Sequence, residues 1–211
     1  MVKNPHQKSL RTATVAKNSG FSLLEVLISI IILSFGMLGM VGLQAAALQS
    51  NREARTQAVA TELGRELADM MRGNKRVSIL TTAAANPYLI GDKTSPLAAN
   101  TPNYCLNAGV TCATALNVAD AQMTEWLARV DSGLSGARVV VCYDDAPYNA
   151  AGTPQWACSP TGAIVQGKAI VLKFGWTKTS TNKSGTTPLD LSTAATSVPS
   201  LIFPLTSGST K

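Results

Sequence analysis

The sequence predicts an α+β protein in which a long amino-terminal α-helix packs, through its second half, on a small antiparallel β-sheet. An apolar stretch from Gly20 to Leu48 runs directly into an amphipathic stretch that ends near Arg72. After it come short stretches rich in β-branched and aromatic residues, separated by loops rich in Pro, Gly and Asn. Three or more antiparallel strands packed on such a helix make an α+β domain.

The apolar stretch predicts a helix that crosses a membrane. It reads GFSLLEVLISIIILSFGMLGMVGLQAAAL, and about 20 residues at about 1.5 Å each span the hydrocarbon core of a bilayer. Glu25 is its only charged residue, and the next one along the chain is Arg52. A carboxylate in such a run is energetically costly, so Glu25 is a candidate functional residue.

Residues 1–20 predict a basic leader that is cleaved between Gly20 and Phe21. Four positive charges precede Phe21, and they are Lys3, Lys8, Arg11 and Lys17. Under the positive-inside rule they place the amino terminus in the cytoplasm and everything after the span outside it. In a secretory signal the apolar region precedes the cleavage site, whereas here it follows. An uncut signal anchor, with Gly20 incidental, is the competing interpretation.

The basic net charge of the chain gives no support for nucleic-acid binding. The formal charge is +6, and loss of the four leader charges lowers it to +2. A nearly neutral mature chain lacks the electrostatic attraction on which nucleic-acid binding depends. We therefore expect no nucleic acid among its partners.

Beyond the span, the helix is predicted to become the spine of a globular domain. Apolar residues recur mostly at spacings of three and four, and they are Leu48, Val59, Leu63, Leu67 and Met70 or Met71. This spacing is typical of an amphipathic helix with one buried side. Gly73 and Asn74 then form a helix stop. The predicted organisation is a leader at 1–20, an apolar helix at 21–48, its amphipathic continuation at 49–73 and an extracytoplasmic domain at 74–211.

Within that domain the sequence predicts a short helix and at least three strands. Residues 74–115 predict a long loop region, and residues 117–130 a helix with one apolar face made of Val118, Met123, Trp126, Leu127 and Val130. Residues 137–143 and 168–176 predict strands, the second with Ile170, Leu172, Phe174 and Trp176 on one face. Residues 144–161 predict a loop and residues 177–187 a turn-like link. Residues 201–205 predict a last strand, which Pro204 places at a sheet edge.

All four cysteines follow the predicted span, where an oxidising compartment favours disulfides. They are Cys105, Cys112, Cys142 and Cys158. Four cysteines allow three pairings, and Cys105–Cys112 with Cys142–Cys158 is favoured because each closes a short local loop. A zinc site is the alternative, but the chain has no C-x-x-C pair and no nearby His to support it.

The residues needed for catalysis are not evident, so we expect a protein that is not an enzyme. His6, the only histidine, lies in the leader, which leaves no Ser-His-Asp, Cys-His or histidine-bearing metal site in the mature chain. Asp144 and Asp145 invite comparison with a calcium loop, but adjacent carboxylates match its spacing poorly, and a solvated turn is favoured. No cofactor or metal is expected.

The amino-terminal residues Gly20, Phe21 and Glu25, followed by the apolar run, resemble the type IV pilins and the type II secretion pseudopilins. The resemblance covers roughly the first third of the chain. It implies a prepilin peptidase that cuts after Gly20 and methylates the new amino terminus at Phe21. It also implies a minor pilin of the bacterial inner membrane that primes pilus assembly with the major pilin, other minor pilins and a tip adhesin, and thereby supports twitching motility. A minor pseudopilin is the first alternative, and a signal-anchored periplasmic enzyme is the second.

The spacing of Phe21 and Glu25 suggests what the carboxylate does. Four residues apart, they share a helix face. Burying an unpaired carboxylate in an apolar bundle costs several kcal/mol, and pairing with the Phe21 amine of a neighbouring subunit relieves that cost. Such a pair forms only at a stagger of about one helical turn, so we hypothesise that Glu25 sets the assembly register.

Overall fold

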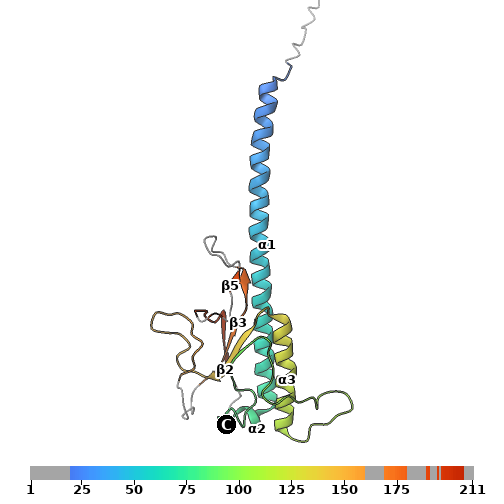
Figure 1. The fold of residues 1–211 in the computed structure, drawn as a ribbon, viewed down its shortest axis with the longest axis vertical. Helices are drawn as coiled ribbons and strands as arrows, with labels where there is room; N and C mark the ends of the chain where they lie inside the picture. Colours follow the sequence, from blue (N-terminus) through green and yellow to red (C-terminus); the bar gives the residue numbers. More distant parts are fainter. Residues whose placement is uncertain (1–19, 160–168, 180–188, 191–193, 195, 207–211) are drawn as a thin grey trace, which may run out of the picture. The chain divides into compact units, whose positions relative to one another are not determined.

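The computed structural model describes residues 20–159, 169–179, 189–190, 194 and 196–206. The chain divides into two compact units, Met1–Leu48 and Gln49–Lys211. The predicted fold class is confirmed: a 51-residue helix, α1 (Leu23–Gly73), is followed by a domain with a four-stranded antiparallel sheet (Figure 1). The predicted leader charges and His6 lie outside the described residues.

Helix α1 follows the predicted bounds closely, because the apolar run and the amphipathic run contain no Pro and end at Gly73. Its buried residues all belong to the second unit, and they are Ala60, Leu63, Gly64, Leu67, Ala68 and Met71. The prediction that Leu63, Leu67 and Met71 face the core is confirmed. The inclusion of Leu48 in that face is wrong, because burial begins only at Ala60 and Leu48 stays exposed.

The main sheet has the strand order β1-β2-β3-β6, with every neighbouring pair antiparallel. The strands are β1 (Ile90–Thr94), β2 (Arg138–Tyr143), β3 (Ile170–Gly175) and β6 (Leu201–Leu205). Strand β6 pairs only with β3, so its predicted edge position is confirmed. An edge tolerates Pro204, since one side of an edge strand makes no ladder hydrogen bonds.

The interpretation of residues 74–115 as loop is wrong in two places. The short helix α2 (Lys75–Ser78) follows α1, and β1 adds a fourth strand to the sheet. Strand β1 has the sequence IGDKT, which lacks the alternation of apolar residues typical of a strand. It is held in the sheet by its antiparallel pairing with β2. The predicted link after Trp176 also begins with a strand, β4 (Lys178–Thr179), which pairs with β5 (Leu189–Asp190).

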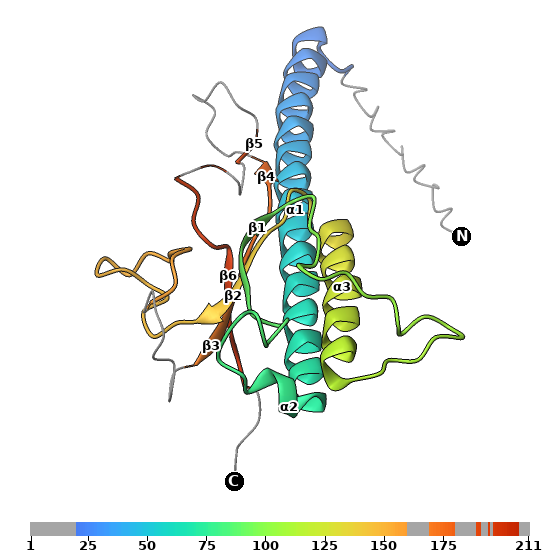
Figure 2. The same ribbon diagram turned by 60° about the horizontal axis from the view of Figure 1, so that its bottom comes forward.

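Helix α3 (Ala115–Gly133) lies beside the second half of α1 in both views (Figures 1 and 2). It starts earlier than predicted because Thr114 caps it, with the hydroxyl accepting a hydrogen bond from the Asn117 N–H at 3.1 Å. Four of the five residues predicted for its apolar face are fully buried, and Val118 is half-buried.

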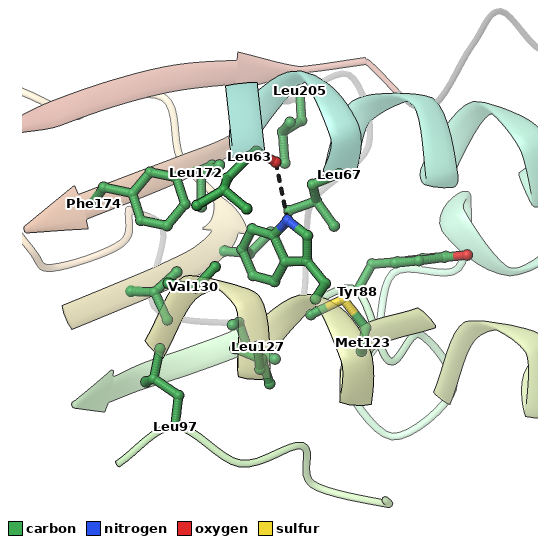
Figure 3. Packing of buried hydrophobic residues seen from close by; sticks show 14 of the residues in the cluster. Leu63, Leu67, Tyr88, Leu97, Met123, Leu127, Val130, Leu172, Phe174 and Leu205 are labelled. Atoms are coloured by element: carbon green, nitrogen blue, oxygen red, sulfur yellow. Dashed lines mark hydrogen bonds between the residues drawn. The ribbon is translucent and has the colours of Figure 1, made fainter. Parts of the chain in front are cut away.

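Trp126 of α3 is fully buried in the hydrophobic core. Figure 3 shows this core, with Leu63 and Phe174 among its labelled members. The indole N–H of Trp126 donates a hydrogen bond to the Leu63 carbonyl of α1 at 3.0 Å, and its ring stacks 5.9 Å from that of Phe174 in β3. Ile170, Leu172, Phe174 and Trp176 all belong to the same hydrophobic cluster, which confirms the predicted alternation in β3. One tryptophan therefore joins both long helices to the sheet.

Candidate processing and assembly site

The bond between Gly20 and Phe21 lies in non-helical backbone directly before α1. Helix α1 begins at Leu23, and the Ser22 carbonyl accepts hydrogen bonds from the N–H groups of Glu25 and Val26 at 3.0 and 3.2 Å. Phe21 is 84% exposed. A peptidase needs an accessible backbone outside regular secondary structure at the bond it cuts, and this segment is exposed and non-helical.

Glu25 lies in the first turn of α1, where a negative charge interacts favourably with the helix dipole. It is exposed in the isolated chain, and every large apolar side chain from Leu23 to Leu43 is exposed as well. The segment therefore presents an apolar surface with one carboxylate near its start. Such a surface needs lipid or neighbouring helices to cover it.

Helix α1 is long and apolar enough to cross a membrane, by length and composition, and no other helix in the described part of the chain is. Its apolar half belongs to the first unit, and all of its buried residues belong to the second.

A buried ion pair in the second unit was not anticipated from the sequence. Lys173 lies in the middle of β3, and its Nζ is 2.5 Å from Asp144 Oδ2, with both side chains fully buried. The same Nζ donates hydrogen bonds to the carbonyls of Gln155 and Ala157 at 2.8 and 2.7 Å. The expectation that Asp144 belongs to a solvated turn is wrong, because Lys173 neutralises the carboxylate inside the protein.

The carboxylate of Asp144 also organises the loop that covers this face of the sheet, residues 144–159, which we call the cover loop. Asp144 Oδ1 accepts hydrogen bonds from the N–H groups of Ala146 and Ser159 at 2.9 and 3.2 Å. Buried charges are tolerated when they are paired, and the other carboxylate oxygen, Oδ2, has the ion pair with Lys173 and no hydrogen bond besides. The one sequence signal was a lysine between two apolar residues in the segment IVLKFG.

Trp156 anchors the cover loop at a second point. Its indole N–H donates to the Ser197 carbonyl at 3.0 Å, and the Arg138 guanidinium lies 4.3 Å from the ring centroid. Arg138 also binds Asp92 of β1 through two nitrogens. The cover loop, the sheet and the segment before β6 are thus joined through one arginine.

The structure joins Cys105 to Cys112 and Cys142 to Cys158, with Cα atoms 4.9 and 6.3 Å apart. These are the pairs that the sequence favours. The second bridge joins Cys142, in strand β2, to Cys158, near the end of the cover loop. Within the described residues, no group of three or more His, Cys, Asp or Glu side chains is placed to hold a metal ion.

Comparison with known proteins bears on the amino terminus alone. The family model described as "Prokaryotic N-terminal methylation motif" matches residues 15–41, a span that contains Gly20, Phe21 and Glu25. No curated protein matches the chain, and no solved structure does. The motif implies processing by a prepilin peptidase, and with the apolar helix it fits anchoring in the inner membrane. The chain therefore carries a prokaryotic N-terminal methylation motif, which indicates a type IV pilin-like or pseudopilin-like protein.

Proposed function

We propose that this chain is a minor pilin: a low-copy subunit that primes assembly of a type IV pilus from the inner membrane. The observation that carries the proposal is the methylation motif at residues 15–41, set on an accessible Gly20–Phe21 bond before an exposed apolar helix. A structural subunit is also the class that the motif suggests in place of an enzyme.

The amino-acid sequence of helix α1 and the residues just before it supports the assignment as a minor pilin. The stretch FSLLEVLISIIILSFGMLGMVGLQAAAL, followed by NREARTQAVATELGRELADMMRGN, resembles the minor pilin PilV, also called the type IV pilus modification protein. That resemblance implies assembly with the major pilin and other minor pilins, and a place at or near the fibre tip with an adhesin-like partner. Piliation and twitching motility would then depend on this chain.

Processing is the first step of this function and can be measured directly. Mass spectrometry of the chain purified from cells with an active prepilin peptidase should find an amino terminus at N-methylated Phe21. The control is the same chain from cells without the peptidase, which should retain the residues before Gly20. A cut at another bond, or an intact leader in the presence of the peptidase, contradicts the proposal.

Assembly rests on Glu25, which we propose pairs with the Phe21 amine of a neighbouring subunit in the apolar seam. Glu25→Gln keeps the shape and removes the charge, so the variant should insert into the membrane normally but be depleted from sheared fibres. Glu62→Gln is the matched control, because Glu62 is an exposed carboxylate on the same helix. Equal incorporation of the Glu25→Gln variant and the wild type argues against a register role.

We further propose that the second unit lies outside the cytoplasm and that Cys105–Cys112 and Cys142–Cys158 are its disulfides in cells. Peptide mapping under non-reducing conditions should recover these two bridges. A peptide linking Cys105 to Cys158, or Cys112 to Cys142, contradicts this pairing.

A minor pseudopilin of a type II secretion system is the second candidate, since the methylation motif favours it equally. Genomic neighbourhood separates the two. Genes for other minor pilins beside this one support the pilus assignment, and genes for secretion-pathway components support the alternative.

A further inference from the structure

A cleft of about 350 Å³ opens in the second unit between helix α3 and the segment that carries β1. Its lining includes Ala84 and Ala99 from the loops and Leu116, Asp120 and Met123 from α3. Most of the lining residues are apolar, Asn100 and Thr101 add neutral polar groups, and Asp120 is the one charged residue among them. A cleft with apolar walls and a few polar groups is the usual composition of a binding site.

The sequence around the cleft leaves this carboxylate without a local counterion. No charged residue occurs between Lys93 and Asp120. The other carboxylates near this part of α3 have partners: Glu125 lies 3.8 Å from Arg129, and Asp131 accepts a hydrogen bond from the Ser95 hydroxyl. Among the described residues, the Asp120 carboxylate has neither a hydrogen-bond donor nor a cation within reach.

The environment of Asp120 is consistent with a missing partner. Its side chain is half-buried, and burial raises the pKa of the carboxyl because no neighbouring positive charge offsets the loss of solvent. A cation brought into the cleft would supply that charge. The pair would be more strongly attractive than one on an open surface, since part of the solvent is excluded.

We propose that this cleft binds a lysine or arginine side chain presented by a neighbouring subunit of the fibre, with the cationic group against Asp120. The alkyl stem of such a side chain suits the exposed Leu116 surface, because long basic side chains bury their methylene groups on apolar surfaces. The neighbour is supplied by the proposed function, on which this inference rests.

The test uses the full mature chain in detergent micelles and two capped pentapeptides. Each has four alanines and a central residue, which is lysine in one and norleucine in the other, so that they differ only in the ammonium group. Binding is followed by NMR through the Met123 methyl group, which lies in the cleft wall. The lysine peptide should bind at least about tenfold more tightly than the norleucine peptide.

Two variants in the cleft and one control outside it locate the site. Asp120→Asn should abolish the preference for lysine, while Glu125→Gln, which removes a carboxylate from the same helix outside the cleft, should leave it unchanged. Ala84→Phe enlarges an exposed wall residue and should weaken both peptides without touching the core. Equal binding of the two peptides, no binding of either, or an unchanged preference in Asp120→Asn overturns the proposal. Such an outcome leaves the processing experiment unaffected.

Discussion

Lys173 and Asp144 are charged residues that the second unit buries completely, on the face of β3 opposite Phe174 and Trp126. Side chains alternate along a strand, so Lys173 points away from the helices and into the cover loop. The backbone carbonyls of that loop surround the ammonium, and the Asp144 carboxylate completes its shell. The pair therefore fixes where the cover loop lies on the sheet.

Lys173→Met tests the contribution of this pair. The variant leaves the Asp144 carboxylate buried without a cation, so we expect a loss of about 3–5 kcal/mol in the free energy of unfolding. Lys178→Met is the control, because Lys178 pairs with Glu53 at the surface and should contribute less than about 1 kcal/mol. Urea unfolding of the full chain in detergent, followed by tryptophan fluorescence, measures both. Equal losses in the two variants contradict a special role for Lys173.

Tyr88 provides a pH-dependent test. It is fully buried, with its hydroxyl donating to Gln122, and burial raises its pKa from 10.0 to about 12, against a smaller lowering by Asn74. The folded state favours the neutral phenol. Its contribution to stability is thus complete below pH 10 and is lost as the pH rises through about 12.

Absorbance titration of the tyrosinate band measures the ionisation of Tyr88. Of the four tyrosines in the chain, Tyr88 should ionise last, and Tyr88→Phe should remove that final step. Burial also raises the pKa of Tyr143, so the two steps should be separated by comparing the variant with the wild type. Ionisation of Tyr88 near the ordinary tyrosine pKa of 10.0 contradicts its burial.

At the level of elements, α1 lies close against the sheet at Gly64. A Cβ atom there would lie 3.3 Å from Leu172 Cδ2 and 3.4 Å from Phe203 Cγ, so the helix and the sheet are already in tight contact. The absence of a side chain lets α1 lie directly on β3 and β6. This contact sets the spacing between the two layers.

Gly64→Leu should destabilise the second unit by about 1–3 kcal/mol, because the added atoms must displace buried neighbours. Ala58→Leu makes a similar enlargement at an exposed position of the same helix and should change stability by less than about 0.5 kcal/mol. Thermal unfolding of both variants provides the comparison. A Gly64→Leu variant as stable as the Ala58→Leu variant means that the layers are not in close contact there.

Elements with a strong local pattern were predictable, and those held by tertiary pairing were not. Helix α1, helix α3 and the strands β2, β3 and β6 each carry an apolar period or a β-branched run. Strand β1 carries neither, and it is ordered by its ladder with β2 and by the binding of Asp92 to Arg138. The burial of Lys173 depended on a partner 29 positions away in sequence, a relation that no local pattern contains.

On the scale of the whole chain, the two units differ in what they leave exposed. In its described residues, 20–48, the first exposes apolar side chains and one carboxylate, whereas the described part of the second buries a hydrophobic cluster that includes Trp126. The candidate processing site could be identified from sequence because Gly20, Phe21 and Glu25 lie within one short segment. The cleft at Asp120 could not, because its walls come from separate segments joined only by folding.

The central claim, a minor pilin that primes pilus assembly, is tested most directly by deleting the gene and counting surface pili by electron microscopy, with twitching scored alongside. We expect few or no pili, restored by the wild-type chain and not by Glu25→Gln. A deletion strain that is normally piliated and twitches, but fails to secrete proteins from the periplasm, would contradict the claim and favour the pseudopilin.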